Sequence, residues 1–127
     1  MIEIDRIDHF VLTVASIEAT CAWYARVLGM EVRQFGPRKA LHFGRHKINL
    51  HEIGREIEPK GLNVGPGTGD FCLITSTPIA SVIAHLNACG VSIVQGPVPR
   101  TGALGPIESV YLRDLDGNLI EIATYQC

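Results

Sequence analysis

The sequence is poor in charged residues, in cysteine and in long apolar runs, and each shortage excludes a class of protein. Its 11 basic and 13 acidic residues are scattered and leave a net charge of −2, so a basic surface for nucleic acid is not expected. The apolar runs fall far short of the roughly 20 residues that span a membrane. Residues 1–6 lack the apolar stretch of a signal peptide. We expect a cytoplasmic protein that binds neither nucleic acid nor a membrane.

Only four cysteines are present, at positions 21, 72, 89 and 127, and no two of them form a C-x-x-C motif. Hydrophobic residues make up 46% of the 127 residues, which is enough for one compact core without disulfides or a structural metal. We therefore expect the cysteines to stay reduced. Any metal site in this chain is interpreted as functional rather than structural.

The chain contains an internal repeat. A shift of 61 positions (71 − 10 = 61) places Phe10 on Phe71 without a gap. The same shift aligns four further identical pairs, namely Leu12 with Leu73, Ala19 with Ala80, Gly29 with Gly90 and Gln34 with Gln95. Self-similarity at a fixed spacing indicates two copies of one supersecondary unit.

The first repeat predicts a βαβββ module at residues 4–53. Residues 9–14 alternate between polar and apolar side chains, as expected for a strand. Ser16 is a suitable N-cap for an amphipathic helix, which should end at Gly29 because glycine favours the left-handed position after a helix. Three short strands are predicted to follow, at 30–36, 39–44 and 46–52.

The second repeat predicts the same order of elements at residues 69–125. A strand at 70–75 precedes a helix that we expect to be capped by Thr77, with Pro78 in its first turn and Gly90 at its end. The other predicted elements are strands at 91–95, 107–113 and 118–124, a long glycine- and proline-rich loop at 96–106 and a tight turn at 114–118. With a linker at 54–68, residues 1–127 are predicted to form one domain of the α+β class.

Strand parity selects the side chains that face away from the helices, because alternate residues of a strand point to opposite faces of its sheet. In the first strand of each module, this face carries His9 and its repeat equivalent Asp70 (9 + 61 = 70). In the last strands it carries His51 and Glu121, which match at a shift of 70 (121 − 51 = 70). Glu52 is the alternative to His51 and would require the reverse parity.

These four side chains have the chemistry of a metal site. Two imidazoles and two carboxylates are ligands that divalent transition metals prefer, and the absence of sulfur ligands argues against Cu(I) and iron–sulfur clusters. The pattern predicts Zn²⁺, Ni²⁺, Mn²⁺, Co²⁺ or Fe²⁺ without choosing among them. The predicted metal ligands are His9, His51, Asp70 and Glu121.

Three residues of the second module are candidates for substrate contacts. Arg100 and Thr101, in the predicted loop, would bind an anionic group through a guanidinium and a backbone N–H. Tyr111 lies on a predicted strand next to that of Glu121 and would line the pocket. An ordinary solvated loop and simple packing of Tyr111 are the alternatives.

Three segments together resemble the vicinal oxygen chelate superfamily, which comprises glyoxalases, bleomycin resistance proteins and dioxygenases. They are Asp8–Val14, the stretch from Trp23-Tyr24 through Leu28-Gly29-Met30, and Leu112–Glu121. Within that superfamily, residues 38–41, 47–52, 72–75 and 96–103 resemble the glyoxalase domain-containing protein 5 group. The match extends over nearly the whole chain.

The resemblance implies two modules whose mixed sheets curl into a cleft, with metal ligands on the first and last strand of each. Our first hypothesis is therefore a glyoxalase I-like, or lactoylglutathione lyase-like, enzyme. Its metal would bind two neighbouring oxygens of a small substrate, and Glu121 or Asp70 would transfer a proton through an enediolate. Asp70 departs from the pattern, because metalloenzymes of the superfamily commonly have histidine there.

Two other functions stay open. His9, His51 and one carboxylate would satisfy the ligand pattern of an Fe(II) dioxygenase. A non-catalytic protein that binds a drug or metabolite, as the bleomycin resistance proteins do, is the second alternative. The resemblance also implies a homodimer, whose modules pair either within one chain or between two.

Overall fold

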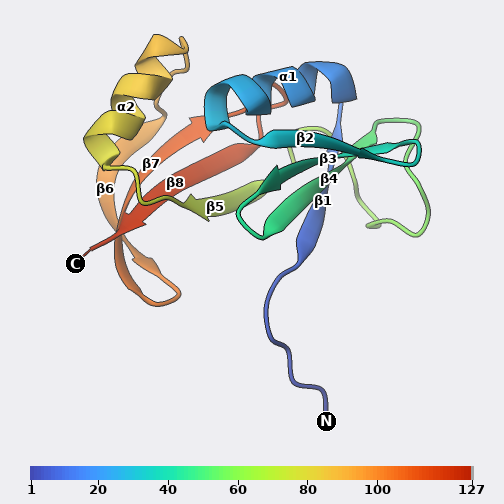
Figure 1. Cartoon of the computed structure of the whole chain (residues 1–127), viewed down its shortest axis with the longest axis horizontal. Helices are drawn as coiled ribbons and strands as arrows, with labels where there is room; N and C mark the ends of the chain where they lie inside the picture. Colours follow the sequence, from blue (N-terminus) through green and yellow to red (C-terminus); the bar gives the residue numbers. More distant parts are fainter. Residues whose placement is uncertain (127) are drawn as a thin grey trace. The chain divides into compact units, whose positions relative to one another are not determined.

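The computed structural model describes residues 1–126. The chain divides into two compact units, Met1–Pro66 and a second that begins at Gly67. Each unit has one helix and one four-stranded mixed sheet, in the order βαβββ (Figure 1). The predicted α+β class and the two modules are therefore confirmed. Cys127, one of the cysteines expected to stay reduced, lies outside the described residues.

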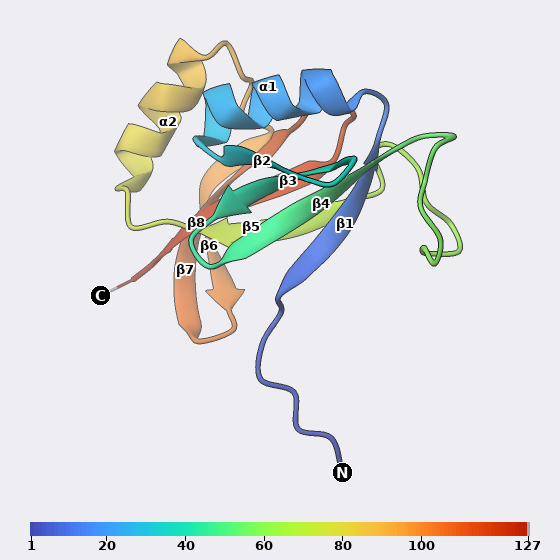
Figure 2. The same ribbon diagram turned by 45° about the vertical axis from the view of Figure 1, so that its right-hand side comes forward.

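The first unit contains β1 (His9–Val14), α1 (Ile17–Leu28), β2 (Glu31–Phe35), β3 (Arg38–Phe43) and β4 (His46–Glu52). Its sheet has the order β1-β4-β3-β2. The first and last strands, β1 and β4, pair in parallel, and the other pairs are antiparallel. Helix α1 lies along one face of this sheet (Figure 2).

Local sequence explains both ends of α1. The Ser16 hydroxyl accepts a hydrogen bond of 3.1 Å from the Ala19 N–H, as an N-cap does. Gly29 follows the helix with φ +65°, a conformation that costs glycine little. The face of the sheet toward α1 is apolar. The core between them contains Leu12, Val14, Leu41, Ile48 and Leu50 of the sheet and Tyr24 and Val27 of the helix.

The second unit contains β5 (Asp70–Ile74), α2 (Ile79–Ala88), β6 (Gln95–Gly102), β7 (Gly105–Arg113) and β8 (Leu119–Tyr125). Its sheet repeats the order of the first, as β5-β8-β7-β6, with β5 and β8 parallel. The predicted turn at 114–118 is present, because the Asp114 carboxylate accepts hydrogen bonds from the N–H groups of Asp116 and Asn118. The core residues are Ile79, Val82, Leu86, Val110, Leu112, Ile120 and Ile122.

Two predictions for the second unit were wrong. Of the strand predicted at 91–95, only Gln95 lies in a strand. The loop predicted at 96–106 instead contains most of strand β6, which pairs with β7 in a hairpin, and the first residues of β7. Prolines are tolerated there because β6 is an edge strand. Thr77 does not cap α2. Pro78 occupies the cap position without a side-chain hydrogen bond, while the Thr77 N–H donates to the Thr75 hydroxyl.

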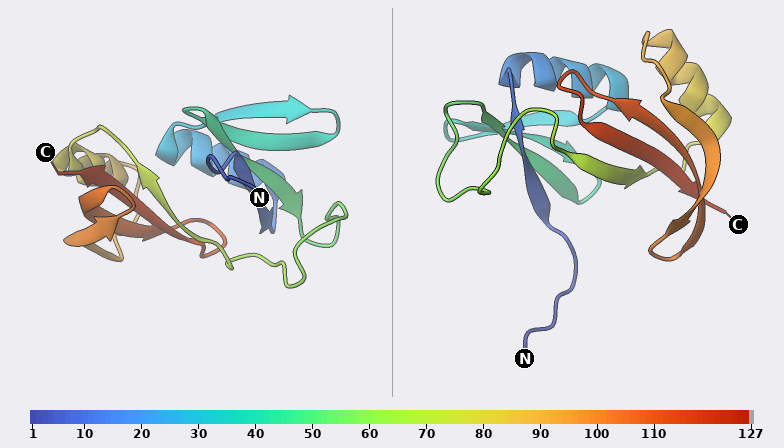
Figure 3. Two further views of the ribbon diagram at one scale, coloured as in Figure 1. Left: turned by 90° about the horizontal axis from the view of Figure 1, so that it is seen from below. Right: turned by 180° about the vertical axis from the view of Figure 1, so that it is seen from behind.

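The segment between β4 and β5 has no helix or strand (Figure 3). Cys21, Cys72 and Cys89 form no disulfide. Within residues 1–126, no helix combines the length and the apolar character needed to cross a membrane.

Gly96 makes the irregular register of β6 possible. Its φ is +115°, and a Cβ there would lie 2.5 Å from the Ser109 carbonyl oxygen and 2.9 Å from the Val110 Cα. The pairing of β6 with β7 shifts between Gln95 and Val98, on either side of this glycine. Glycine at such a bulge permits the close approach of the two backbones.

We predict that Gly96→Ala lowers the free energy of unfolding by about 1 to 3 kcal/mol, the usual cost of such backbone strain. Urea unfolding of the wild type and the variant measures this difference. Gly65→Ala is the matched control, since Gly65 has no positive φ and its added Cβ would meet nothing within 4 Å. Equal unfolding midpoints for the Gly96 variant and the wild type would contradict the assigned register.

Candidate functional site

The open face of the first sheet, opposite α1, carries both candidate histidines. In the parallel pairing of β1 with β4, His9 lies opposite Lys47, Val11 opposite Asn49 and Thr13 opposite His51. His9 and His51 are therefore on the same face but four residues apart in register. At about 3.3 Å per residue, this separates them by about 13 Å along the strands.

The second sheet shows which residues are equivalent. Asp70 lies opposite Leu119, and Glu121 lies opposite Cys72, two positions further along β5. The same diagonal step from His9 in the first sheet leads to Asn49, not to His51. The last strands thus match at a shift of 72 (121 − 49 = 72), which corrects the shift of 70 that paired His51 with Glu121.

Asn49 is the residue that sequence reasoning missed. Its side chain is buried, with 4% of the residue exposed, and its Oδ1 has no hydrogen-bond partner among the described residues. Leaving a buried amide oxygen unsatisfied is costly, so such an atom in a native protein calls for an explanation. A ligand to that oxygen would supply one.

Glu52 does not compete for the open face. It lies opposite Val14 in the register, so its side chain points to the α1 side of the sheet. Its Oε1 accepts a hydrogen bond of 3.1 Å from the Ile17 N–H at the start of α1. The carboxylate of Glu52 therefore stabilises the helix N-terminus.

His9 is oriented by its neighbour. Its Nδ1 is hydrogen-bonded to Asp8 Oδ2 at 2.7 Å, and this bond is the main reason that the pKa of Asp8 is lowered. Nε2, the other ring nitrogen, is then the one that can bind a metal. Metal-ligating histidines commonly have such a carboxylate on their second nitrogen.

In the second unit, Glu121 is also held by a hydrogen bond to a neighbouring side chain. The Ser109 hydroxyl donates to Glu121 Oε2 at 2.6 Å, which leaves Oε1 available. Cys72 lies on β5, directly opposite Glu121. The pKa of its thiol is raised to about 11, first by burial and then by the negative charge of Glu121. Its thiol is therefore protonated at neutral pH and supplies no thiolate ligand.

Two of the three candidate substrate contacts come together beside Glu121. Tyr111 lies opposite Glu121 in the pairing of β7 with β8. Arg100 Nε donates to the Tyr111 hydroxyl at 2.9 Å. Thr101 lies next to Arg100 on β6, so its side chain points to the opposite face of the sheet. The structure does not bring Thr101 to this site.

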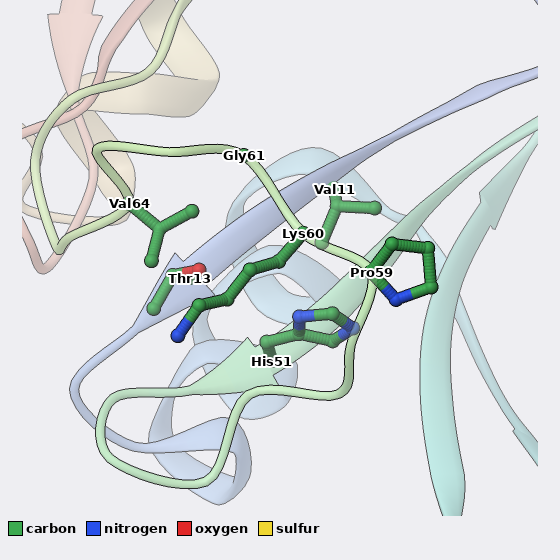
Figure 4. A pocket seen from close by; sticks show the side chains of 7 residues that line it. All are labelled: Val11, Thr13, His51, Pro59, Lys60, Gly61 and Val64. Atoms are coloured by element: carbon green, nitrogen blue, oxygen red, sulfur yellow. The ribbon is translucent and has the colours of Figure 1, made fainter.

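His51 lines a separate cavity of about 380 Å³ on the open face of the first sheet (Figure 4). Arg38 Nη2 donates to His51 Nε2 at 3.3 Å. The pKa of His51 is lowered, first by burial and then by the positive charge of Arg38. The lining residues are Val11, Thr13, His51, Pro59, Lys60, Gly61 and Val64.

The candidate metal ligands thus occur as one pair in each unit. His9 and Asn49 form the pair of the first sheet, and Asp70 and Glu121 form that of the second. Within residues 1–126, no group of three or more His, Cys, Asp or Glu side chains is arranged to hold a metal ion.

Comparison with known proteins identifies the family. The model of the Glyoxalase/Bleomycin resistance protein/Dioxygenase superfamily matches residues 6–122. The chain belongs to this superfamily. Its members share a fold but not one reaction, so this membership does not decide the chemistry.

Relatives more than half identical to this chain extend over almost all of it. Virulence protein STM3117 of Salmonella typhimurium is 55% identical over 123 residues, which are 96% of this chain and 85% of that protein. Its crystal structure superposes with a TM-score of 0.97 at 54% identity, covering 98% of this chain and 100% of the other. Glyoxalase domain-containing protein RDO1 of Mycosarcoma maydis is 51% identical over 94% of this chain and 68% of its own length.

The proximity of Cys72 to Glu121 gives a testable prediction. Only the thiolate reacts with N-ethylmaleimide, so removal of the Glu121 charge by Glu121→Gln should lower the pKa of Cys72 and speed its alkylation at pH 8. Peptide mass spectrometry of chelator-treated protein measures the rate. Glu108→Gln is the matched control, because Glu108 lies on the opposite face of the same sheet. Equal rates in both variants would show that the two side chains do not interact.

Proposed function

We propose that this protein is a metal-dependent enzyme of the glyoxalase I type, acting on a small molecule with two neighbouring oxygens. One observation carries the proposal: each unit holds a pair of donors on its open face, at the same diagonal step between its first and last strands. The proposed ligands are His9, Asn49, Asp70 and Glu121. Compared with the prediction from sequence, Asn49 replaces His51.

The donor set fits a divalent transition metal. One imidazole, one amide oxygen and two carboxylates suit Zn²⁺, Ni²⁺, Mn²⁺, Co²⁺ or Fe²⁺. Asp8 and Ser109 provide the outer hydrogen bonds that orient His9 and Glu121. The buried Oδ1 of Asn49, which has no partner within residues 1–126, gains one in this assignment. Such an ion, when bound, polarises the substrate oxygens and stabilises the negative charge that develops on them.

Glu121 is the proposed proton carrier. Ser109 donates to Oε2, the oxygen that would hold the ion. Oε1 would then be the oxygen that accepts a proton from the substrate carbon and returns it to the neighbouring carbon. The Tyr111 hydroxyl already accepts a hydrogen bond from Arg100. Its own proton is therefore available to a substrate oxygen next to Glu121. Asp70 is exposed at the start of β5, and we assign it a ligand role.

The register disfavours the dioxygenase alternative. An Fe(II) site with two histidines and one carboxylate would need His51 beside His9, whereas these side chains are four residues apart in register. The amide of Asn49, a weaker ligand than a carboxylate, is the observation that favours the other alternative, a protein that binds its ligand without turnover.

A homodimer is part of the proposal. Strands β1 and β5 each lie at an edge of their sheet, and edge strands are able to pair with a further strand. The pairing partner is either the other unit of the same chain or a second copy, and light scattering after gel filtration measures the mass. The cytoplasmic location stays a prediction from the sequence.

Metal analysis of variants tests the ligand set. We predict that His9→Ala, Asn49→Ala and Glu121→Ala each lower metal affinity by about tenfold or more, since each removes a ligand. His51→Ala should retain the metal, and His85→Ala, on α2, is the surface control. Elemental analysis after dialysis against each of the five metals measures the occupancy.

Loss of metal in His51→Ala with full retention in Asn49→Ala would overturn the assigned register. A wild-type protein that takes up none of the five metals would favour the binding protein instead. With metal bound, turnover of the hemithioacetal of methylglyoxal and glutathione would support glyoxalase chemistry. Stoichiometric metal without that turnover would contradict the glyoxalase assignment, while leaving the ligand set intact.

A further inference from the structure

The cavity beside His51 contains more hydrogen-bond donors than the protein itself uses. Arginine is only ever a donor, so its bond to His51 Nε2 makes that nitrogen the acceptor. The proton of the neutral imidazole is then on Nδ1. This Nδ1 is buried and has no hydrogen-bond partner within residues 1–126. His51 as a whole is only 5% exposed, so its N–H group is not hydrated by bulk solvent.

Two cations accompany this buried donor. The Arg38 side chain lies next to His51 and stacks over the Phe35 ring at 4.9 Å, and its buried Nε also has no partner among residues 1–126. Lys60 extends along the cavity from the segment that follows β4 (Figure 4). Arg38 forms no ion pair with any of the described residues.

The acidic groups near the cavity do not cancel this charge. Lys60 Nζ is bonded to Glu56 Oε1 at 2.9 Å and lies 3.8 Å from Glu58 Oε1. Glu58 is 74% exposed, so solvent screens its charge. Glu56, whose buried Oε2 has no hydrogen-bond partner within residues 1–126, balances the charge of Lys60, and the positive charge of Arg38 remains. A group that accepts hydrogen bonds and carries negative charge fits this arrangement.

The cavity lies close to Asn49, one of the proposed metal ligands. Thr13 and His51 form one cross-strand pair of the register, and Val11 and Asn49 form the pair two residues earlier. Two residues correspond to about 7 Å along a strand. A ligand of a few carbon atoms therefore spans the distance from the cavity to Asn49. The rest of the lining is largely apolar, from Val11, Pro59 and Val64.

We infer that this cavity binds a carboxylate of the substrate, which makes the substrate a short oxygenated carboxylic acid. His51 Nδ1 and Lys60 Nζ donate to the carboxylate, and Arg38 supplies the balancing charge. The Thr13 hydroxyl, on the cavity wall, is a further donor. Binding of a carboxylate in this cavity does not depend on the proposed function. Only the statement that the bound acid is the substrate rests on it.

Binding of malate to chelator-treated protein tests the carboxylate site without the metal. Malate, a four-carbon hydroxy acid, should shift the backbone amide resonances of Thr13, His51 and Lys60 in a ¹H–¹⁵N NMR titration. Dimethyl malate, its neutral ester, should not. We expect Arg38→Gln and Lys60→Gln each to weaken malate binding by about tenfold or more. The first removes the balancing positive charge, and the second removes a charged hydrogen-bond donor.

Lys39→Gln is the matched control. Lys39 is adjacent to Arg38 but lies opposite Leu50, on the helix side of the sheet, so its loss should leave malate affinity unchanged. The same spectra show whether each variant is folded. Equal shifts by the ester, or undiminished malate affinity in both the Arg38 and Lys60 variants, would overturn the inference.

The two proposals fail separately. Malate binding with no uptake of metal would contradict the metal enzyme and keep the carboxylate site. Metal uptake that depends on His9 and Glu121, without malate binding, would contradict the carboxylate site and keep the metal enzyme.

Discussion

The parallel pairing of the first and last strand in each unit is the constraint on which the candidate site depends. This pairing determines which side chains lie next to each other on the open face of the sheet. Because it is repeated in both units, His9 and Asn49 have the same relation as Asp70 and Glu121. Four donors in two equivalent pairs are a stronger indication of a metal site than any one of these residues alone.

The two open faces are chemically different, although their folds repeat. The first presents donors and positive charge, in Arg38, His51 and Lys60, around a cavity. The second presents a carboxylate, Glu121, held by Ser109 beside Tyr111. In our account the first face anchors the acid and the second moves the proton.

Much of the fold follows from local signals. The repeat, both helices, the Ser16 cap and the 114–118 turn are all recognisable in the sequence because each depends on a short pattern of residues. Strand β6 was not recognised, since its two prolines and Gly96 are typical of a loop. They are accommodated only because β6 lies at the edge of its sheet, and a strand's place in a sheet is a property of the whole unit.

The candidate site was predicted less completely, for a physical reason. Parity placed His9, His51, Asp70 and Glu121 on the open faces, in agreement with the register. A shift of two residues preserves parity, however, so parity cannot distinguish Asn49 from His51. The cavity was also not foreseen. Lys60 and Val64 come from the predicted linker, and only the folded chain shows that they line a cavity with His51.

Anomalous diffraction from crystals grown with Mn²⁺ tests the central claim most directly. We expect an anomalous peak within bonding distance of His9 Nε2, Asn49 Oδ1 and carboxylate oxygens of Asp70 and Glu121, supplied by one chain or by two. A peak bonded to His51 instead of Asn49, or none near either donor pair in a fully loaded crystal, would contradict it.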